Sequence, residues 1–119
     1  MQGNGDMVHR DIVRRGAVRK AELSHWQGQS GRDYGLNAES LDDFAMRESD
    51  LYVIAKGSHV LWVGSTEELV ADPMSRTRFR LALDCATNVF RMDAPENRLS
   101  TIWDLEQAVP AAETVAQAA

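Results

Sequence analysis

Two short apolar runs on either side of a tight turn constrain the fold of this chain more than any other feature. The runs are Leu51–Ala55 and Val60–Val63, and both are rich in the β-branched and aromatic residues that favour strands. The intervening Lys56-Gly57-Ser58-His59 supplies the turn. We therefore predict a β-hairpin. Because both runs are almost entirely apolar, we expect the strand pair to be covered on both faces.

Helix-start signals follow this hairpin directly. Ser65 and Glu68 have the spacing of a capping box, which predicts a short helix. Asp72 followed by Pro73 predicts the start of a longer helix, expected to run to Met92. The apolar residues at helical spacing along it are Phe79, Leu83, Ala86, Val89 and Phe90. We expect this helix to be the main packing element of the fold.

The remaining segments give weaker signals. Residues 22–36 predict a first hairpin that turns at Gly28 and Gly31, because glycine permits the positive φ that tight turns need. A short helix is predicted over Ala38–Arg47, with an asparagine as its N-cap. Residues 99–108 are compatible with either a helix or a strand, and the helix is slightly favoured.

Together these elements predict an α+β fold, with a small antiparallel sheet from two β-hairpins and one long amphipathic helix packed on it. The length of 119 residues favours one domain, which we assign to residues 22–108. Residues 1–21 are expected to be a basic N-terminal arm or marginal helix, and residues 109–119 a flexible tail.

Composition excludes several classes of protein. No apolar run approaches the roughly 18 residues of a membrane-spanning helix, and the first residues lack the apolar core of a secretion signal, so we expect a cytoplasmic protein. The single cysteine, Cys85, excludes an internal disulfide and is expected to be a small buried hydrophobe. The formal net charge of −5 argues against broad nucleic-acid binding, although basic clusters at 10–20 and 76–80 leave room for a local contact.

The segment from Asp50 to Thr66 resembles the GIY-YIG domain. The first motif of that family corresponds to Asp50-Leu51-Tyr52 and the second to Trp62-Val63-Gly64, and the similarity extends over about residues 50–92. The resemblance implies two adjacent strands followed by a helix. It also implies an activity, because enzymes of this family cut DNA phosphodiesters. They use tyrosines that position or activate water, an arginine that binds phosphate and a glutamate that holds a divalent metal. For an active nuclease, it assigns catalytic roles to Tyr52 and Arg76, with Glu96 or Glu106 as the acid and Mg²⁺ as the cofactor.

The sequence departs from this pattern at several positions. Trp62 replaces the second tyrosine, and an indole N–H can donate a hydrogen bond but cannot accept a proton. Asp50 replaces the glycine that begins the first motif, and the long predicted helix contains no glutamate. Histidine spacing predicts no metal site. We therefore expect a chain without nuclease chemistry and without a cofactor.

The sequence thus predicts a non-catalytic binding or accessory module on a GIY-YIG-like scaffold, which contacts a protein or a nucleic acid and no membrane. Its expected binding residues are Trp62, His59, Arg76 and Arg80. One alternative is a metal-dependent DNA endonuclease of the GIY-YIG type. A second alternative is a small assembly component derived from a phage or mobile element. The sequence leaves the oligomeric state open.

Overall fold

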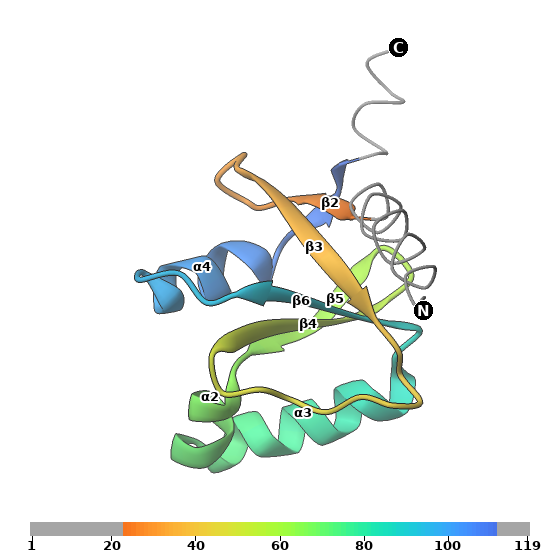
Figure 1. Cartoon of the computed structure of the whole chain (residues 1–119), viewed down its shortest axis with the longest axis vertical. Helices are drawn as coiled ribbons and strands as arrows, with labels where there is room; N and C mark the ends of the chain where they lie inside the picture. Colours follow the sequence, from red (N-terminus) through yellow and green to blue (C-terminus); the bar gives the residue numbers. More distant parts are fainter. Residues whose placement is uncertain (1–22, 112–119) are drawn as a thin grey trace, which may run out of the picture.

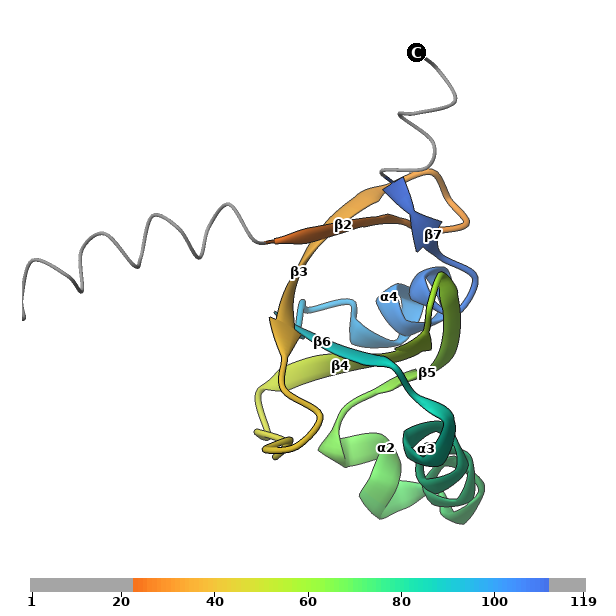
Figure 2. The ribbon, with the colours of Figure 1, turned by 90° about the vertical axis from the view of Figure 1, so that its right-hand side faces the viewer.

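A curled six-stranded antiparallel sheet organises the residues that the computed structural model describes, 23–111. In chain order the elements are β2 (Ser24–Gln27), β3 (Asp33–Glu39), β4 (Asp50–Lys56), β5 (His59–Gly64), α2 (Thr66–Ala71), α3 (Pro73–Cys85), β6 (Asn88–Asp93), α4 (Arg98–Leu105) and β7 (Val109–Pro110). The strand order across the sheet is β5-β4-β6-β3-β2-β7. The sheet forms a half-barrel (Figure 1), and Figure 2 shows α4 inside the curl and α3 outside it.

Strand β4 is buried on both faces because its side chains alternate between two cores. Leu51 and Val53 point into the curl, whereas Tyr52 and Ile54 point toward α3. The register with β5 shifts after Ile54, which leaves Leu61 as the extra residue of a β-bulge. The predicted β4–β5 hairpin is therefore confirmed, and β4 is covered on both faces as expected, whereas β5 is exposed at His59 and Leu61.

Strand β3 joins the two halves of the sheet because it changes partner along its length. Its first half pairs with β2, where Trp26 lies opposite Tyr34. Its last residues, 37–39, pair instead with Val89–Arg91 of β6. One strand therefore belongs to two ladders that lie at an angle to each other, and the sheet curls around the inner core.

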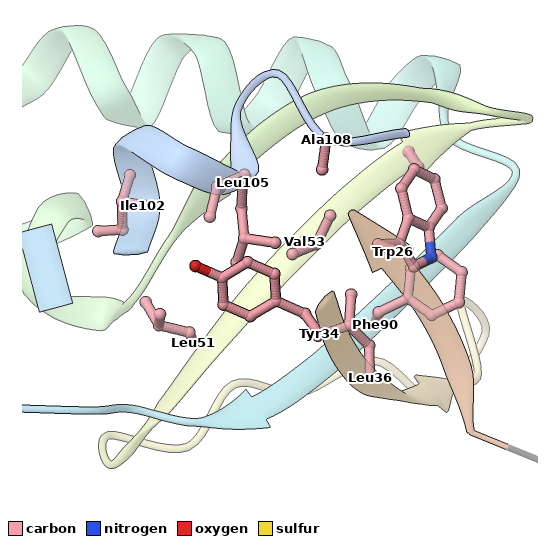
Figure 3. Packing of buried hydrophobic residues seen from close by; sticks show 11 residues of the cluster. Trp26, Tyr34, Leu36, Leu51, Val53, Phe90, Ile102, Leu105 and Ala108 are labelled. Atoms are coloured by element: carbon pink, nitrogen blue, oxygen red, sulfur yellow. The ribbon is translucent and has the colours of Figure 1, made fainter. Parts of the chain in front are cut away.

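The two cores lie on opposite faces of the sheet. The inner core fills the space between the sheet and α4 (Figure 3), and its buried members are Trp26, Tyr34, Leu36, Leu51, Val53, Ala55, Val63, Phe90, Ile102, Leu105 and Ala108. The outer core lies between the sheet and α3, and its buried members are Tyr52, Ile54, Trp62, Ala82 and Val89. Strands β4, β5 and β6 each contribute to both cores, because their side chains alternate between the two faces of the sheet.

The predicted small sheet with one long helix is wrong. Strand exceeds helix, at 36% against 31%, and the expected helix ends at Cys85 instead of Met92. Val89 and Phe90 belong to β6, where strand alternation sends them into opposite cores. Backbone pairing with β4 on one side and β3 on the other outweighs the helical spacing of this stretch. Cys85 is exposed instead of buried.

The predicted helix over Ala38–Arg47 is also wrong. Residues 37–39 complete β3, and residues 40–49 form turns and irregular backbone. The strand is favoured because its backbone groups pair with β6 and because Glu39 reaches Arg91 across the ladder. Phe44 still packs against the outer core, as a loop residue whose ring meets Tyr52 edge to face.

The predicted helix starts are confirmed. Ser65 and Glu68 form the capping box of α2, and Asp72 caps α3 with Pro73 in its first turn. The helix favoured within residues 99–108 is present as α4, which begins at Arg98 with Asn97 at the N-cap position. At the C-terminal end, residues 109–110 pair with β2. The predictions for residues 1–21 and for the tail after residue 111 lie outside the described residues.

No helix in the described part of the chain is long and apolar enough to span a membrane.

Candidate functional site

Tyr52, the expected catalytic residue, lies in the outer core. Its side chain has no solvent exposure, and its ring meets Phe44 edge to face at a centroid distance of 5.4 Å. Its hydroxyl oxygen accepts a hydrogen bond from the backbone N–H of Arg47 at 2.8 Å. A reactant therefore has no access to this hydroxyl in the present conformation, and the contacts of Tyr52 are those of a packing residue.

Trp62 packs beside Tyr52 on the same face of the sheet. It is also buried, and its ring meets Phe79 of α3 edge to face at 4.9 Å. Its indole N–H donates to the hydroxyl of Ser75 at 3.1 Å. Trp62 therefore anchors α3 to the sheet, and its buried ring offers no surface for a ligand.

Of the expected binding residues, Arg76 and Arg80 lie one turn apart on α3, whereas His59 lies on β5. Arg76 donates to the carbonyl oxygens of Leu69 and Val70 at 2.7 and 3.4 Å, so its guanidinium satisfies the last turn of α2. Arg80 is exposed on α3. His59 is exposed at the start of β5, whereas α2 follows the other end of that strand. The structure therefore groups Arg76 with Arg80 and places His59 on a different element, and their binding role stays a prediction.

An ion cluster that sequence reasoning missed lies beside Tyr52. Arg91 contacts Glu39 at 2.9 Å, Asp50 at 3.6 Å and Asp93 at 4.0 Å. The hydrogen bond to Glu39 raises the pKa of Arg91 despite partial burial. The Asp50 side chain is only 5% exposed, and its Oδ2 atom has no hydrogen-bond partner among the described residues. Arg91 therefore compensates a buried carboxylate and ties three strands together.

A second polar cluster, also missed from the sequence, joins α4 to the β2–β3 turn. The carboxylate of Asp104 accepts hydrogen bonds from the backbone N–H of Ser30, the Ser30 hydroxyl and the Tyr34 hydroxyl, each at 2.7 Å. Figure 3 shows the Tyr34 hydroxyl pointing toward α4. The cluster also explains Gly28, because a Cβ atom there would lie 2.5 Å from the Asp104 carboxylate. Positive φ is found at Gly31 but not at Gly28, so only one of the two turn glycines has the predicted role.

Acid is expected to destabilise the fold through Asp104. Burial alone would raise the pKa of Asp104, but hydrogen bonds from Ser30 and Tyr34 outweigh it and hold the pKa below its usual value. The folded state therefore binds this proton less readily than the unfolded state. The contribution of Asp104 to the free energy of unfolding is fully present above a pH of about 4, and it is lost as the pH falls through the pKa of Asp104 in the folded state. Urea unfolding at several pH values between 7 and 3 tests this, and Asp104→Asn should flatten the acid limb. Equal acid limbs in the two proteins would contradict the assignment.

The same carboxylate, after burial itself, raises the pKa of the Tyr34 hydroxyl. The contribution of neutral Tyr34 is therefore present below a pH of about 10 and is lost as pH rises through its folded pKa. The cluster thus stabilises the fold across the neutral pH range, and this stabilisation is lost at strongly acidic and strongly alkaline pH.

An accessible hollow lies between α2 and α4 in the described structure. It has a volume of about 710 Å³, and Figure 1 shows the two helices on the same side of the molecule. Arg98 of α4 contacts Glu67 at 2.8 Å and Glu68 at 2.9 Å, so an ion pair fixes the distance between the helices. Burial would raise the pKa of Glu68, but hydrogen bonds from Ser65 and Arg98 lower it, and Glu68 stays charged. We call this hollow the α2–α4 groove; its lining residues are Glu48, Thr66, Glu67, Glu68, Val70, Ala71, Asp72, Arg98 and Leu99.

The α2–α4 groove combines negative charge with exposed apolar side chains. Four carboxylates line it against one guanidinium, and that guanidinium is already paired. Val70 is 81% exposed and Leu99 is 68% exposed. Trp103, one helical turn after Leu99, is also exposed and borders a smaller hollow of about 220 Å³ next to Asp104. Leu99 and Trp103 therefore form an apolar ridge on α4 between two hollows.

The sequence carried a signal for this ridge. Ile102 and Leu105 define the buried side of α4, and Leu99 and Trp103 lie four residues apart on another side. These two apolar residues therefore lie apart from the side of the helix that Ile102 and Leu105 bury. The groove could not be predicted in this way, because it depends on how α2 and α4 are placed relative to each other, and no local sequence pattern specifies that placement.

No protein-family model matches the chain, and no curated protein or solved structure is significantly similar to it.

Proposed function

We propose that this chain is a binding module that docks a basic, amphipathic segment of a protein in the α2–α4 groove. The observation that carries the proposal is the combination of a hollow of about 710 Å³, an excess of carboxylates and two exposed aliphatic side chains in its lining. Exposed apolar patches rimmed by charge are typical of protein-interaction sites. A phosphate backbone would be repelled by Glu48, Glu67 and Asp72, so the groove favours a protein ligand over a nucleic acid.

The groove is also largely preformed. Arg98 holds α2 and α4 together, and the capping box keeps the first turn of α2 in place. The module therefore loses little conformational entropy when a ligand binds. Leu99 and Val70 offer apolar contact, and the carboxylates at the rim select cationic side chains.

The endonuclease alternative lacks an accessible reaction centre. Tyr52 and Trp62 are buried, and Arg76 is bonded to α2. Among residues 23–111, no three His, Cys, Asp or Glu side chains are grouped closely enough to hold a metal ion. The two adjacent strands and the following helix that the GIY-YIG resemblance implies are present as β4, β5 and α2, and membership of that family stays a prediction. The assembly-component alternative depends on residues 1–21 and 109–119, most of which lie outside the described residues.

A labelled peptide tests the proposal. The probe is a fluorescent peptide of about fifteen residues with leucine and lysine at helical spacing. Leu99→Ser is expected to weaken its binding about tenfold, because one side chain loses most of its apolar burial. Glu48→Lys is expected to weaken it about threefold, the size of an exposed ion pair. Fluorescence anisotropy on the full chain measures both.

The matched control is Leu81→Ser. Leu81 is 61% exposed on α3 and does not line the groove. Its loss should leave the affinity unchanged, and a peptide with glutamate in place of lysine should not bind. The proposal is wrong if Leu81→Ser and Leu99→Ser have the same effect, or if neither peptide binds. Metal-dependent plasmid cleavage that Tyr52→Phe abolishes would instead favour the endonuclease.

A further inference from the structure

We infer that the smaller hollow beside Trp103 binds one pyranose ring of a neutral sugar. This hollow lies between α4 and the β2–β3 turn, and we call it the Trp103 hollow; its lining residues are Ser30, Arg32, Tyr34, Asn97, Ser100, Thr101, Trp103 and Asp104. It shares no lining residue with the α2–α4 groove, so the inference goes beyond the proposed function.

The size of the Trp103 hollow limits its ligand to one small group. Pockets for drug-sized molecules have volumes of roughly 300–1,000 Å³. The Trp103 hollow is smaller, with a volume of about 220 Å³. A single six-membered ring therefore matches this volume, whereas a whole nucleotide or several residues of a peptide exceed it.

The lining of the Trp103 hollow is polar and balanced in charge. Among the lining side chains, only Arg32 and Asp104 carry a charge. Burial raises the pKa of Asp104, but hydrogen bonds from Ser30 and Tyr34 and the nearby charge of Arg32 lower it, so the carboxylate stays charged. One negative and one positive group therefore face the hollow, which favours neither an anion nor a cation. Hydroxyl groups suit such a lining, because each of them both donates and accepts a hydrogen bond.

Trp103 gives this polar hollow an apolar wall. Its side chain is 58% exposed, whereas Trp26 and Trp62 are buried. An indole combines a large apolar ring with one N–H donor. A β-D-glucopyranoside has only equatorial substituents, so its axial C–H bonds form an apolar face and its hydroxyls lie around the edge. This distribution of apolar and polar groups matches one tryptophan surrounded by hydroxyl, amide and guanidinium groups.

Contacts within the protein hold the two sides of the Trp103 hollow together. Asp104 binds Ser30 and Tyr34, and the side-chain amide of Gln29 donates to the carbonyl oxygen of Trp103 at 3.0 Å. The backbone at Trp103 is therefore fixed relative to the turn before Arg32. A sugar that enters the hollow consequently orders few additional protein groups.

A sugar titration of the full chain tests the inference, with methyl β-D-glucopyranoside as the probe. Because the other two tryptophans are buried, iodide quenches mainly the fluorescence of Trp103. Saturating sugar is expected to lower the iodide quenching constant about threefold, with a dissociation constant of about 1 mM, the scale for a ligand of about a dozen non-hydrogen atoms. Mannitol is the control ligand, because it carries hydroxyls without a rigid apolar face, and it should leave the quenching unchanged.

Variants of Trp103 are measured by ligand-detected NMR, which needs no tryptophan fluorescence. Trp103→Ala should weaken sugar binding at least about tenfold, whereas Trp103→Phe, which keeps an aromatic face, should weaken it about threefold. Because Trp103 is largely exposed, both variants are expected to fold. Leu99→Ser is the matched control on the same helix; it changes the α2–α4 groove and should leave sugar affinity as it is.

Three results would overturn the inference. The first is unchanged iodide quenching at a sugar concentration far above 1 mM, about fifty times that value. The second is equal protection by mannitol, or equal sugar binding by Trp103→Ala and the unsubstituted chain. The third is protection of Trp103 by the leucine-lysine peptide and not by the sugar, which would assign Trp103 to the peptide surface and leave the proposed function in place.

Discussion

Replacing Asp104 with alanine is expected to lower the free energy of unfolding by about 4 kcal/mol, because three hydrogen bonds to one charged group are lost together. The Tyr34 hydroxyl is left without its partner inside the core, and so is one backbone N–H of the β2–β3 turn. Two further hydrogen bonds join that turn to α4 without the carboxylate, because the backbone N–H and the side-chain amide of Gln29 donate to the carbonyl oxygens of Asp104 and Trp103. Urea unfolding followed by tryptophan fluorescence gives the change, since Trp26 and Trp62 are buried.

Two further variants make this result interpretable. Asp84→Ala removes a carboxylate from an exposed position of α3 and is expected to change stability by less than about 0.5 kcal/mol. Asp104→Asn keeps the shape and one acceptor, so it should lose about half as much as the alanine variant. If the alanine variant fails to fold, the asparagine variant still provides a measurement. A loss no larger than that of Asp84→Ala would show that the cluster contributes nothing to stability.

Replacing Arg91 with methionine is expected to lower the free energy of unfolding by about 3 kcal/mol, because a buried carboxylate loses its compensating charge. Asp50 is the affected group, since its Oδ2 atom already lacks a hydrogen bond and depends on the guanidinium 3.6 Å away. Methionine keeps the aliphatic length of the side chain, so packing changes little. Chemical unfolding measures the loss.

The test of cause is a double substitution. Arg91→Met combined with Asp50→Leu removes both charges, and it is expected to recover at least half of the loss. Arg80→Met, at an exposed arginine of α3, is the matched control and should have little effect. Asp50 is not the reason for the instability if the double variant loses as much free energy of unfolding as Arg91→Met and Asp50→Leu lose when added together.

Local signals in the sequence were sufficient for several elements of the fold. The β4–β5 hairpin follows from two dense runs of strand-forming residues, and the two helix starts follow from a capping box and an Asp-Pro pair. Each of these signals depends on neighbouring residues only. They therefore persist in the folded structure, where tertiary contacts reinforce them.

The errors came from long-range pairing. Val89 and Phe90 have helical spacing with Phe79 and Leu83, but the backbone of β6 gains two strand partners by leaving the helix. Residues 37–39 leave their predicted helix for the same reason. Sequence patterns report the period of nearby residues, whereas the choice between helix and strand here depends on distant residues, as in the pairing of Asn37 with Arg91.

The candidate site was mostly missed for a related reason. Tyr52 and Trp62 were singled out by a motif resemblance, yet strand alternation places both beneath α3. The α2–α4 groove depends on Arg98 reaching Glu67 and Glu68 from a later helix. A single sequence contains these residue types, but it does not state which elements will lie side by side.

The position of β6 has a consequence for synthesis of the chain. This strand lies between β3 and β4, although it follows both of them in the sequence. A nascent polypeptide that has left the ribosome only as far as α3 therefore holds two separate hairpins with unpaired edges. These edges are templates for pairing with other chains until β6 arrives to cover them. A nascent chain that has emerged only as far as residue 87 should consequently aggregate more readily than one that has emerged beyond residue 93.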